Sequence, residues 1–312
     1  MYLVTGGGGF IGSNIVEALV GAGQRVRVLD DFSNGLESNL TPFGDAVEVV
    51  HGDIRDASTV ARAVDGIEVV LHLAALGSVP RSIENPALSN DVNVGGTVNV
   101  LDQAQRAGVG RIVFSSSSSV YGDNPTLPKH EGLVPSPISP YAVTKLAGEA
   151  YATAFHRVHG LDTVCLRYFN VFGPRQRPDS AYAAVIPLFM GWANEGRALV
   201  INGDGEQSRD FTYVDNVVQA NLAAAQASGV GGGIYNVACG ERYSLLDIIG
   251  AIEEISGKTL QREHREPRAG DVRHSEAAIA AAADALGYRT VVSFREGMER
   301  TWAAFQAGRT GA

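Results

Sequence analysis

The feature that most constrains the fold is a glycine cluster in the first twelve residues, MYLVTGGGGFIG. An apolar run, 2–4, enters the cluster and an apolar-periodic segment, 10–20, leaves it, which predicts a strand, a tight turn and a helix. Gly6, Gly9 and Gly12 are spaced so that the chain can turn sharply, the backbone can approach a pyrophosphate, and the helix can pack closely on the strand. A phosphate would then bind at the positive end of this helix.

A second apolar run, 25–29, follows the predicted helix and ends at Asp30. A carboxylate at the end of that strand can accept hydrogen bonds from both ribose hydroxyls of an adenosine. It would repel a 2′-phosphate, so the pattern favours NAD over NADP. Without Asp30 the glycines would be equally compatible with a tight turn that binds nothing.

The bulk composition limits the classes of partner. A chain of 312 residues can build a large core and two lobes. A net charge of −9 disfavours nucleic acid or an acidic membrane surface, so an anionic substrate must meet local arginines. Cys165 and Cys239 give neither a disulfide framework nor a metal-ligand cluster, and we expect both to be buried.

We expect neither a signal peptide nor a membrane-spanning segment. The first predicted strand begins at residue 2, which leaves no room for a signal peptide. No apolar run reaches the ~18 residues that span a bilayer. We therefore expect a cytoplasmic protein without a membrane partner.

Runs that predict strands alternate with runs that predict helices in the first half of the chain. After the opening unit, the predicted strands are 47–51, 69–73, 111–114 and 164–168. The predicted helices are 59–64, 85–107 and 141–159. This alternation is typical of an α/β fold whose doubly wound parallel sheet has helices on both faces.

The pattern changes after Asn170. A Pro- and Arg-rich loop is followed by a helix-like segment, 183–196, and a segment, 199–211, whose Gly-Asp-Gly turn predicts a hairpin. A strand, 234–237, and a closing helix, 293–305, come later. We expect a first domain of residues 1–170 plus about 212–240, and a smaller one of residues 171–211 and 241–312.

Tyr141 and Lys145 carry the strongest signal for catalysis. Residues four apart share a face of a helix, so the phenol and the ammonium would point the same way. Tyrosine, with a pKa near ~10, is a poor base at neutral pH. A neighbouring lysine cation favours the phenolate, and the pair can then remove a proton from a substrate alcohol. A surface tyrosine one turn from a lysine is common by chance, but here it follows a dinucleotide turn.

Five serines, 115–119, follow the predicted strand 111–114. The carboxyl ends of strands in an open α/β sheet are where ligands bind. A serine there can hydrogen-bond the reacting hydroxyl. A low-complexity linker is the alternative, but it would not stand between the apolar runs IVF and VYG.

Together TGGGGFIG, Asp30, GDIRD, LHLAA, SSSSSVYG, YAVTK and RYFNVFGPRQ resemble the extended short-chain dehydrogenase/reductases, and among them the NAD-dependent UDP-glucose/UDP-N-acetylglucosamine 4-epimerases. The resemblance implies a Rossmann-type sheet and a smaller C-terminal domain that binds a nucleotide sugar. The catalytic set it implies is Ser117, Tyr141 and Lys145. The implied NAD site comprises Gly6, Gly9, Phe10, Ile11, Gly12, Asp30, Asn34, Asp53, Ile54, Leu73, Ala74, Asn93, Tyr141, Lys145 and Tyr168.

The same resemblance implies a substrate site in the second lobe. Its diphosphate would meet Arg209 and Arg268, because an arginine fork suits phosphate oxygens; Arg175 is a weaker candidate. The further residues implied are Asn170 at the diphosphate, Val185 to Leu188 at the uracil, Asp271 at the ribose, and Ser117, Gly77, Ser78 and Ser275 at the sugar.

The implied reaction is inversion of the sugar 4-hydroxyl through a transient 4-keto sugar. A dehydratase is disfavoured, because Ser118 and Ser119 stand where similar dehydratases have an Asp-Glu pair. A UDP-uronate 4-epimerase is a second alternative, with Arg81 as a possible partner of the extra carboxylate. A dinucleotide-sensing regulator would need neither Tyr141 nor Lys145.

Two finer expectations concern substrate size and assembly. Ser275 falls where some epimerases have a tyrosine that closes the pocket at the sugar 2-position, so N-acetylated sugars should be accepted as well as glucose and galactose. The helices 85–107 and 141–159 could pair with their copies in a homodimer. Ala147, Ala150, Ala154 and Val158 would suit that contact, although a role inside a single chain's core fits the sequence equally well.

Overall fold

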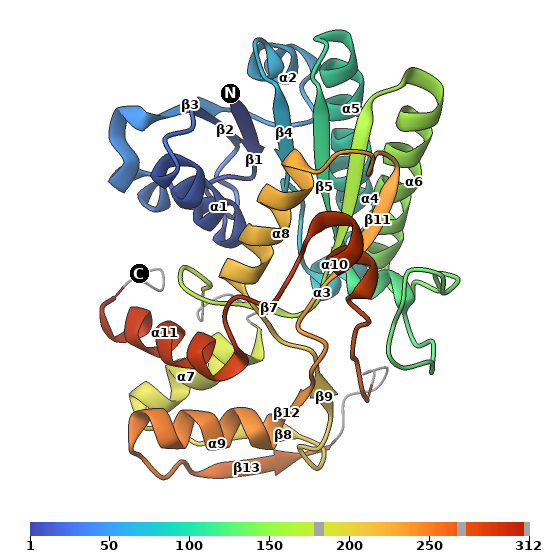
Figure 1. Ribbon diagram of the computed structural model, residues 1–312. Coiled ribbons are helices and arrows are strands. Elements are labelled where there is room, and N and C mark those ends of the chain that lie inside the picture. Colours follow the sequence, from blue (N-terminus) through green and yellow to red (C-terminus); the bar gives the residue numbers. More distant parts are fainter. Residues whose placement is uncertain (178–183, 267–272, 309–312) are drawn as a thin grey trace.

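The computed structural model describes residues 1–177, 184–266 and 273–308 (Figure 1). Its larger lobe is built on a seven-stranded sheet in the order β11-β6-β5-β4-β1-β2-β3, in which every neighbouring pair is parallel. The strands are β1 (Tyr2–Thr5), β2 (Val26–Asp30), β3 (Val47–His51), β4 (Val69–His72), β5 (Arg111–Ser117), β6 (Asp162–Tyr168) and β11 (Gly233–Val237). The expected doubly wound Rossmann-type sheet is confirmed.

Helices cover both faces of this sheet. α1 (Phe10–Gly21) packs beside α8 (Val214–Gln226) on one face, and α8 also contacts β4, β5 and β6. α2 (Ala57–Val64), α5 (Gly96–Arg106) and α6 (Pro140–His159) pack side by side on the other. α3 (Val79–Glu84) and α4 (Pro86–Asn90) also pack against α6. Short 3-10 turns are η1 (Glu37–Asn39), η2 (Thr41–Ala46) and η4 (Ser118–Tyr121).

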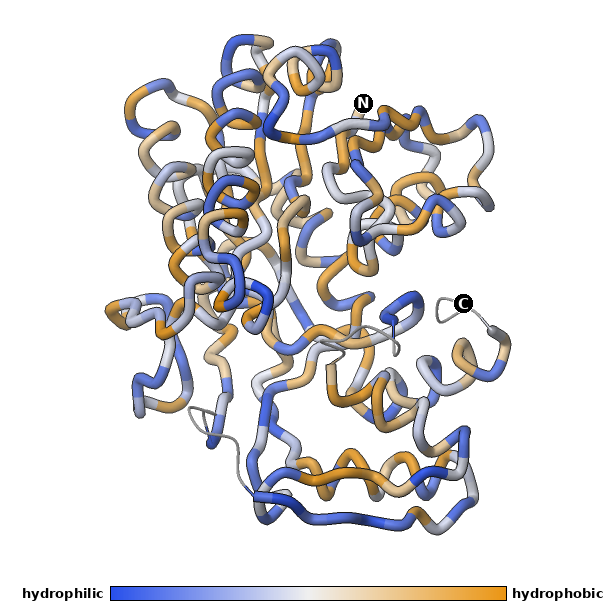
Figure 2. Tube along the Cα trace, turned by 180° about the vertical axis from the view of Figure 1, so that it is seen from behind, coloured by the Kyte–Doolittle hydropathy of each residue, from blue (hydrophilic) through white to orange (hydrophobic). Residues whose placement is uncertain are grey.

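The smaller lobe gathers later segments below the carboxyl edge of the sheet (Figure 1). Its helices are α7 (Val185–Glu195), α9 (Leu245–Ser256) and α11 (Phe294–Gln306), while α10 (Ala280–Leu286) packs on β11 and α8. Its short strands are β7 (Val171–Phe172), β8 (Leu199–Asn202), β9 (Ser208–Arg209), β10 (Thr212–Tyr213), β12 (Tyr243–Ser244) and β13 (Arg262–Arg265). Figure 2 shows β13 as a hydrophilic outer edge beside the apolar α9.

The predicted hairpin at 199–211 is wrong. β8 pairs in parallel with β13, and β9 pairs antiparallel with β12, so the two arms do not pair with each other. Gly203 and Gly205 do form a turn, with φ of +81° and +85°. The arms diverge after it because each finds a partner far along the chain.

Helix 85–107 forms almost as predicted, but one turn of it is unusual. The helical run covers α4, a π-helical turn η3 (Asp91–Gly95) and α5. Helix α6 begins one residue earlier than predicted, since Ser139 caps it by accepting a hydrogen bond from the N–H of Ala142 at 3.2 Å and Pro140 occupies its first turn.

Two further expectations can be compared with the structure. Cys165 is buried as expected, but Cys239 is only partly buried, so that part of the expectation is wrong. Among the helices of residues 1–177, 184–266 and 273–308, none is both long enough and apolar enough to cross a membrane.

Candidate active site

Three adjoining cavities follow the carboxyl edge of the sheet into the smaller lobe. The first, of about 130 Å³, lies over the glycine turn, and we call it the cofactor cavity. The second, of about 920 Å³, lies over the serine run, and we call it the catalytic cavity. The third, of about 530 Å³, lies in the smaller lobe, and we call it the nucleotide cavity. Leu73 and Ala75 line the first two, and Asn170 and Arg209 line the last two, so the cavities form one trough.

The glycine turn leaves no space for side chains. Gly6 has φ of +72°, and a Cβ on it would lie 2.8 Å from the N atom of Ala74. A Cβ on Gly12 would lie 2.2 Å from the carbonyl oxygen of Gly6. Gly9 precedes α1, whose first turn has no side-chain cap, so its N–H groups remain available to phosphate oxygens. The turn therefore fits a dinucleotide pyrophosphate.

Asp30 is held at the wall of the cofactor cavity by the same turn. Its Oδ2 accepts from the N–H of Gly8 and its Oδ1 from the N–H of Phe32, both at 2.8 Å. Burial raises the pKa of Asp30, and the two N–H groups oppose that rise. The remaining lone pairs can accept ribose hydroxyls, as the sequence predicted.

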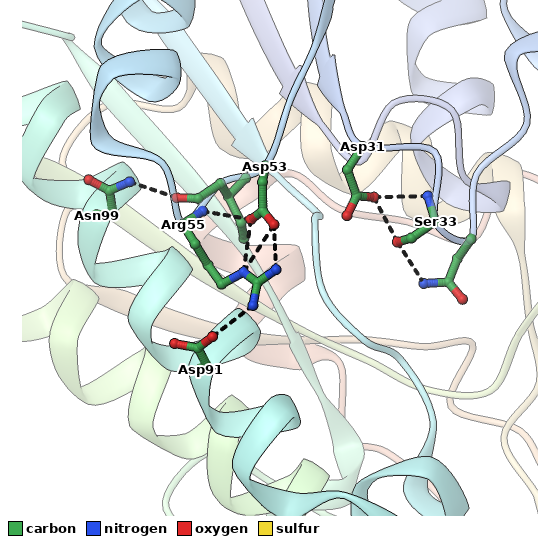
Figure 3. A network of polar contacts seen from close by, with 8 residues as sticks. Asp31, Ser33, Asp53, Arg55, Asp91 and Asn99 are labelled. Atoms are coloured by element: carbon green, nitrogen blue, oxygen red, sulfur yellow. Dashed lines mark hydrogen bonds and ion pairs between the residues drawn. The ribbon is translucent and has the colours of Figure 1, made fainter.

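A polar network lies behind the wall of the cofactor cavity that contains Asp53 and Ile54 (Figure 3). Arg55 donates to both carboxylate oxygens of Asp53 and, at 2.7 Å, to Asp91. These bonds to Arg55 hold the pKa of Asp53 below its usual value. Asn99 donates to the carbonyl of Ile54 at 2.7 Å and so fixes the other predicted residue of this wall.

The predicted cofactor residues are brought together with two exceptions, Gly12 and Asn93. Gly6, Gly9, Asp30, Asn34, Asp53, Ile54, Leu73 and Ala74 line the cofactor cavity, and Phe10, Ile11, Leu73, Tyr141, Lys145 and Tyr168 line the catalytic cavity. Gly12 lies behind the turn. Asn93 instead braces the chain, accepting from the N–H of Leu76 at 2.7 Å and donating to Thr144 at 3.0 Å. Neither Gly12 nor Asn93 lines a cavity, and Asn34 accepts a bond from Arg81 at 2.7 Å.

Ser117, Tyr141 and Lys145 converge in the catalytic cavity. β5 is three residues longer than predicted, because Ser115, Ser116 and Ser117 pair with β6. α6 carries the tyrosine and the lysine across this strand end. The Nζ atom of Lys145 donates to the carbonyl of Ser115 at 2.8 Å and lies 5.9 Å from the centre of the Tyr141 ring.

Burial tunes the catalytic pair. It raises the pKa of Tyr141, and a hydrogen bond with the Ser117 hydroxyl opposes the rise. It lowers the pKa of Lys145 to about 8, against the attraction of Glu149. Burial, with the charge of Lys145 second, also lowers the pKa of His72 to about 3, so His72 is neutral beneath the site. The lysine is therefore the cation nearest the tyrosine among these groups.

The nucleotide cavity combines an apolar wall with cations. Val185, Leu188, Phe189 and Trp192 come from α7. Arg197, Arg209 and Arg265 line the same cavity. Arg209 is oriented by two backbone carbonyls, those of Ser208 at 2.9 Å and Arg273 at 3.1 Å. An apolar slot beside arginines suits a base next to a diphosphate.

The remaining predicted substrate residues occupy different positions. Asn170 donates to the carbonyl of Asp210 at 3.0 Å and lines both substrate-side cavities. Gly77 and Ser275 line the catalytic cavity, whereas Ser78 caps α3 and does not. Arg175 pairs with Glu17 at 2.6 Å and lines none of the three cavities. Arg268 and Asp271 lie outside the described residues.

Several cavity residues carried no signal that the sequence interpretation used. Trp192 lies seven positions after Val185 and four after Leu188, a helical spacing that could have identified it. Lys129 lines the catalytic cavity from a loop and Arg265 lines the nucleotide cavity from an edge strand. Only the tertiary fold brings these two to the trough.

Comparison with known proteins identifies the family to which the chain belongs. The model of the NAD dependent epimerase/dehydratase family matches residues 2–238. The chain belongs to this family. The expected NAD cofactor and the assignment as an isomerase enzyme are thereby confirmed.

Relatives match along nearly the whole chain. A UDP-glucose 4-epimerase of Mycolicibacterium smegmatis is 39% identical over 303 residues, 96% of each chain. The structure of a UDP-N-acetylglucosamine 4-epimerase from Methanobrevibacter ruminantium, in complex with UDP-N-acetylmuramic acid, superposes with a TM-score of 0.94 at 38% identity and covers 98% of each chain. A UDP-glucuronic acid 4-epimerase from Bacillus cereus, with UDP-glucuronic acid and NAD, has a TM-score of 0.91 at 32% identity and covers 98% of this chain and 99% of that one.

Proposed function

We propose that this protein is a 4-epimerase of UDP-hexoses, acting on UDP-glucose and UDP-galactose and on their N-acetylated forms. One observation carries the proposal: Ser117, Tyr141 and Lys145 face a cavity that joins the cofactor cavity on one side to the nucleotide cavity on the other. A sugar held by its nucleotide in the smaller lobe would therefore reach the tyrosine and the cofactor together.

Each catalytic side chain has a distinct task in this proposal. Ser117 positions the sugar 4-hydroxyl, and Tyr141 removes its proton and later returns it. Lys145 favours the phenolate by its charge. When bound, NAD supplies a hydride acceptor that can also give the hydride back. The arginines hold the diphosphate while the sugar ring turns, so the transient 4-keto sugar can present its other face.

The lining of the catalytic cavity disfavours elimination of water. Among the described residues that line it, none is an aspartate or glutamate. Ser118 and Ser119, the positions that would carry the acid and base of a dehydratase, both line it. An epimerase needs only one group that moves a proton, which Tyr141 provides.

A UDP-uronate 4-epimerase is the second candidate, and Lys129 is the observation that favours it. This lysine lines the catalytic cavity and is 2% exposed. Its ammonium donates to the carbonyl of Asn124, and the charge of Asp123 acts on it without a direct ion pair among the described residues. Arg81, the cation suggested by the sequence, instead bonds Asn34 and does not line this cavity. A sugar carboxylate would supply Lys129 with a counter-ion.

Incubation with UDP-galactose, UDP-N-acetylgalactosamine and UDP-galacturonate, followed by chromatography of the sugars, tests both candidates. The first two should be converted to their gluco forms. Absence of any product from a preparation that holds NAD would refute the epimerase proposal. Lys129→Met should leave the hexose rates nearly unchanged; a selective loss with the uronate would favour the second candidate.

Ser275 provides a test of substrate size. It lines the catalytic cavity, and a small side chain there leaves room for an acetamido group. Ser275→Tyr should lower kcat/KM for the N-acetylated sugars by about tenfold or more and spare UDP-galactose. Ser275→Ala is the matched control and should change neither. If the tyrosine variant keeps its N-acetyl turnover, Ser275 does not gate the pocket.

We further propose a homodimer formed through α6. Val143, Tyr151 and Val158 on this helix are 51%, 43% and 75% exposed. Ala150 and Ala154 are exposed as well, so the apolar face does not belong to this chain's own core. Ala154→Arg should convert a dimer to a monomer in light scattering, whereas a monomeric wild-type protein would exclude the proposal.

A further inference from the structure

An ion pair is buried directly behind the catalytic residues. Glu149 on α6 and Arg167 on β6 are joined by two parallel hydrogen bonds of 2.7 and 2.9 Å. Their side chains are 2% and 3% exposed. In every other ion pair of residues 1–177, 184–266 and 273–308, both side chains are more than a tenth exposed.

The pair joins the three elements that carry the site. Glu149 lies one helical turn after Lys145, and it accepts a short hydrogen bond from the hydroxyl of Ser116. Ser116 stands between Ser117 and Ser115, whose carbonyl accepts from Lys145. Arg167 pairs with Ser116 across the sheet and precedes Tyr168, which lines the catalytic cavity. A shift of the pair would therefore move both sides of the catalytic cavity.

A buried ion pair is a costly way to join two elements. Removing each ion from water costs several kcal/mol, and well-packed apolar side chains often replace such a pair without loss of stability. The pair is also incompletely satisfied, because Nη1 of Arg167 has no hydrogen-bond partner among the described residues, although the guanidinium lies 4.7 Å from the Tyr121 ring centre. Its position suggests a role for its charges.

The other titratable groups around α6 carry little charge near neutral pH. His72 on β4 is neutral, and burial raises the pKa of Tyr121, of Cys165 and of Tyr168, so these stay protonated. The charged groups on the neighbouring helices lie at the surface or are only partly buried; they are Arg81, Glu84, Asp91, Asp102 and Arg106. Among the charged groups on α6, β5 and β6, Lys145, Glu149 and Arg167 are therefore the buried ones. Lys129 is also buried and lines the catalytic cavity, and the charge of Glu131 acts on Tyr121.

We propose that Glu149 and Arg167 are positioning residues that balance the charge behind Tyr141 and Lys145 and so fix the pH range in which the pair can move a proton. Glu149 favours the lysine cation, and Arg167 neutralises the surplus negative charge that would otherwise oppose the phenolate. Tyr141 and Lys145 then lie in front of an ion pair whose net charge is close to zero. The readout rests on the proposed epimerase function.

The test compares three variants by the pH dependence of kcat. In Glu149→Gln a negative charge is lost, so both Tyr141 and Lys145 release their protons more readily. Both limbs of the bell-shaped plot of kcat against pH then move to lower pH. In Arg167→Met a positive charge is lost, and both limbs move to higher pH. The limb that reports Lys145, one helical turn from Glu149, should shift by about one pH unit, as expected for a unit charge about 6 Å away at an effective dielectric constant of about 40. The limb that reports Tyr141, two turns from Glu149, should shift in the same direction by about half as much. The double variant should return toward the wild-type profile.

Opposite shifts that cancel are the signature of a charge effect. Shifts of the same sign, or reduced rates without a shift, would overturn the proposal. Comparing any two of the three variants with the wild-type protein gives the effect of removing a single charge. The test therefore remains possible if one variant does not fold. Glu149→Asp and Arg167→Lys, which keep the charges, should keep both limbs within a few tenths of a unit.

Matched controls distinguish this electrostatic role from a purely structural one. Arg111 and Asp162 pair at 2.5 Å at the opposite end of the same two strands. Asp162→Asn should lower the melting temperature and leave the limbs unmoved. Phenolate absorbance, taken as the difference from Tyr141→Phe, follows the tyrosine without turnover. An inactive wild-type protein would refute the proposed function. An active wild-type protein whose pH profile does not move in the Glu149 and Arg167 variants would refute this inference.

Discussion

The two ends of the trough are built by different means. The cofactor cavity is lined within residues 6–92, and its lining includes four glycines and two alanines. The nucleotide cavity is lined by side chains taken from residues 170–265, on α7, β8, β9, α9 and β13. The first depends on how closely the chain can approach a ligand, and the second on which side chains reach it.

This difference predicts different responses to mutation. Added atoms should damage the cofactor end, where the chain packs on itself. Altered functional groups should damage the nucleotide end, where we propose that arginines bind the diphosphate. The Tyr141 hydroxyl lies between the two, and its removal should affect neither binding event.

Tyr141→Phe should have the largest effect on turnover. It removes the only proton-transferring hydroxyl proposed for the reaction, so kcat should fall by about 10² to 10⁴. The aromatic ring stays, and NAD content and nucleotide affinity should remain at wild-type values. Measured kcat, bound NAD and calorimetric binding of UDP check this. Loss of either binding event would show that the two ends are not independent of the residues between them.

The contrast also explains what the sequence could predict. The glycine turn, Asp30 and the Tyr141–Lys145 spacing are local patterns, and a helix or strand places them without reference to distant residues. The structure brings them to one trough because the carboxyl ends of parallel strands share an edge.

The predictions that were wrong or missing depend on distant partners. The hairpin at 199–211 was suggested by its glycines, but pairing with β12 and β13 decides the strand arrangement. The last three residues of β5 became strand because β6 extends beside them. Lys129 and Arg265 reach the trough through loops and an edge strand that no local period identifies. Propensity and spacing carry no information about such contacts.

Gly12→Ala should be the most damaging change at the cofactor end. The new Cβ would lie 2.2 Å from the carbonyl oxygen of Gly6, and both backbones would have to separate. We expect a loss of about 3 kcal/mol in the free energy of unfolding together with loss of bound NAD. Gly21→Ala in the same helix is the matched control, since nothing lies within 4 Å of its Cβ, and it should be neutral or stabilising. Chemical denaturation of both variants measures this; equal effects would refute the steric argument.

Arg209→Gln should be the clearest change at the nucleotide end. It removes a charged donor from the wall shared by the nucleotide and catalytic cavities, so KM for the nucleotide sugar should rise by about 10- to 100-fold. Bound NAD and thermal stability should change little. Steady-state kinetics measures the change in KM, and a thermal melt measures the change in stability. A fall in kcat alone would mean that Arg209 acts on the reacting sugar and not on its anchor.

The smallest effect should come from adding one carbon at the nucleotide end. Val185→Ile adds a methyl group beside a cavity of about 530 Å³, and both side chains are β-branched, so the start of α7 keeps its helical preference. The free energy of unfolding should stay within about 0.5 kcal/mol, and KM should change by about threefold at most. The same single carbon at Gly12 is expected to lower the free energy of unfolding by about 3 kcal/mol. Denaturant titration of the two variants side by side measures the contrast directly: a large loss in Val185→Ile would mean that the nucleotide end is as tightly packed as the cofactor end, and that its affinity depends on shape as much as on the arginines.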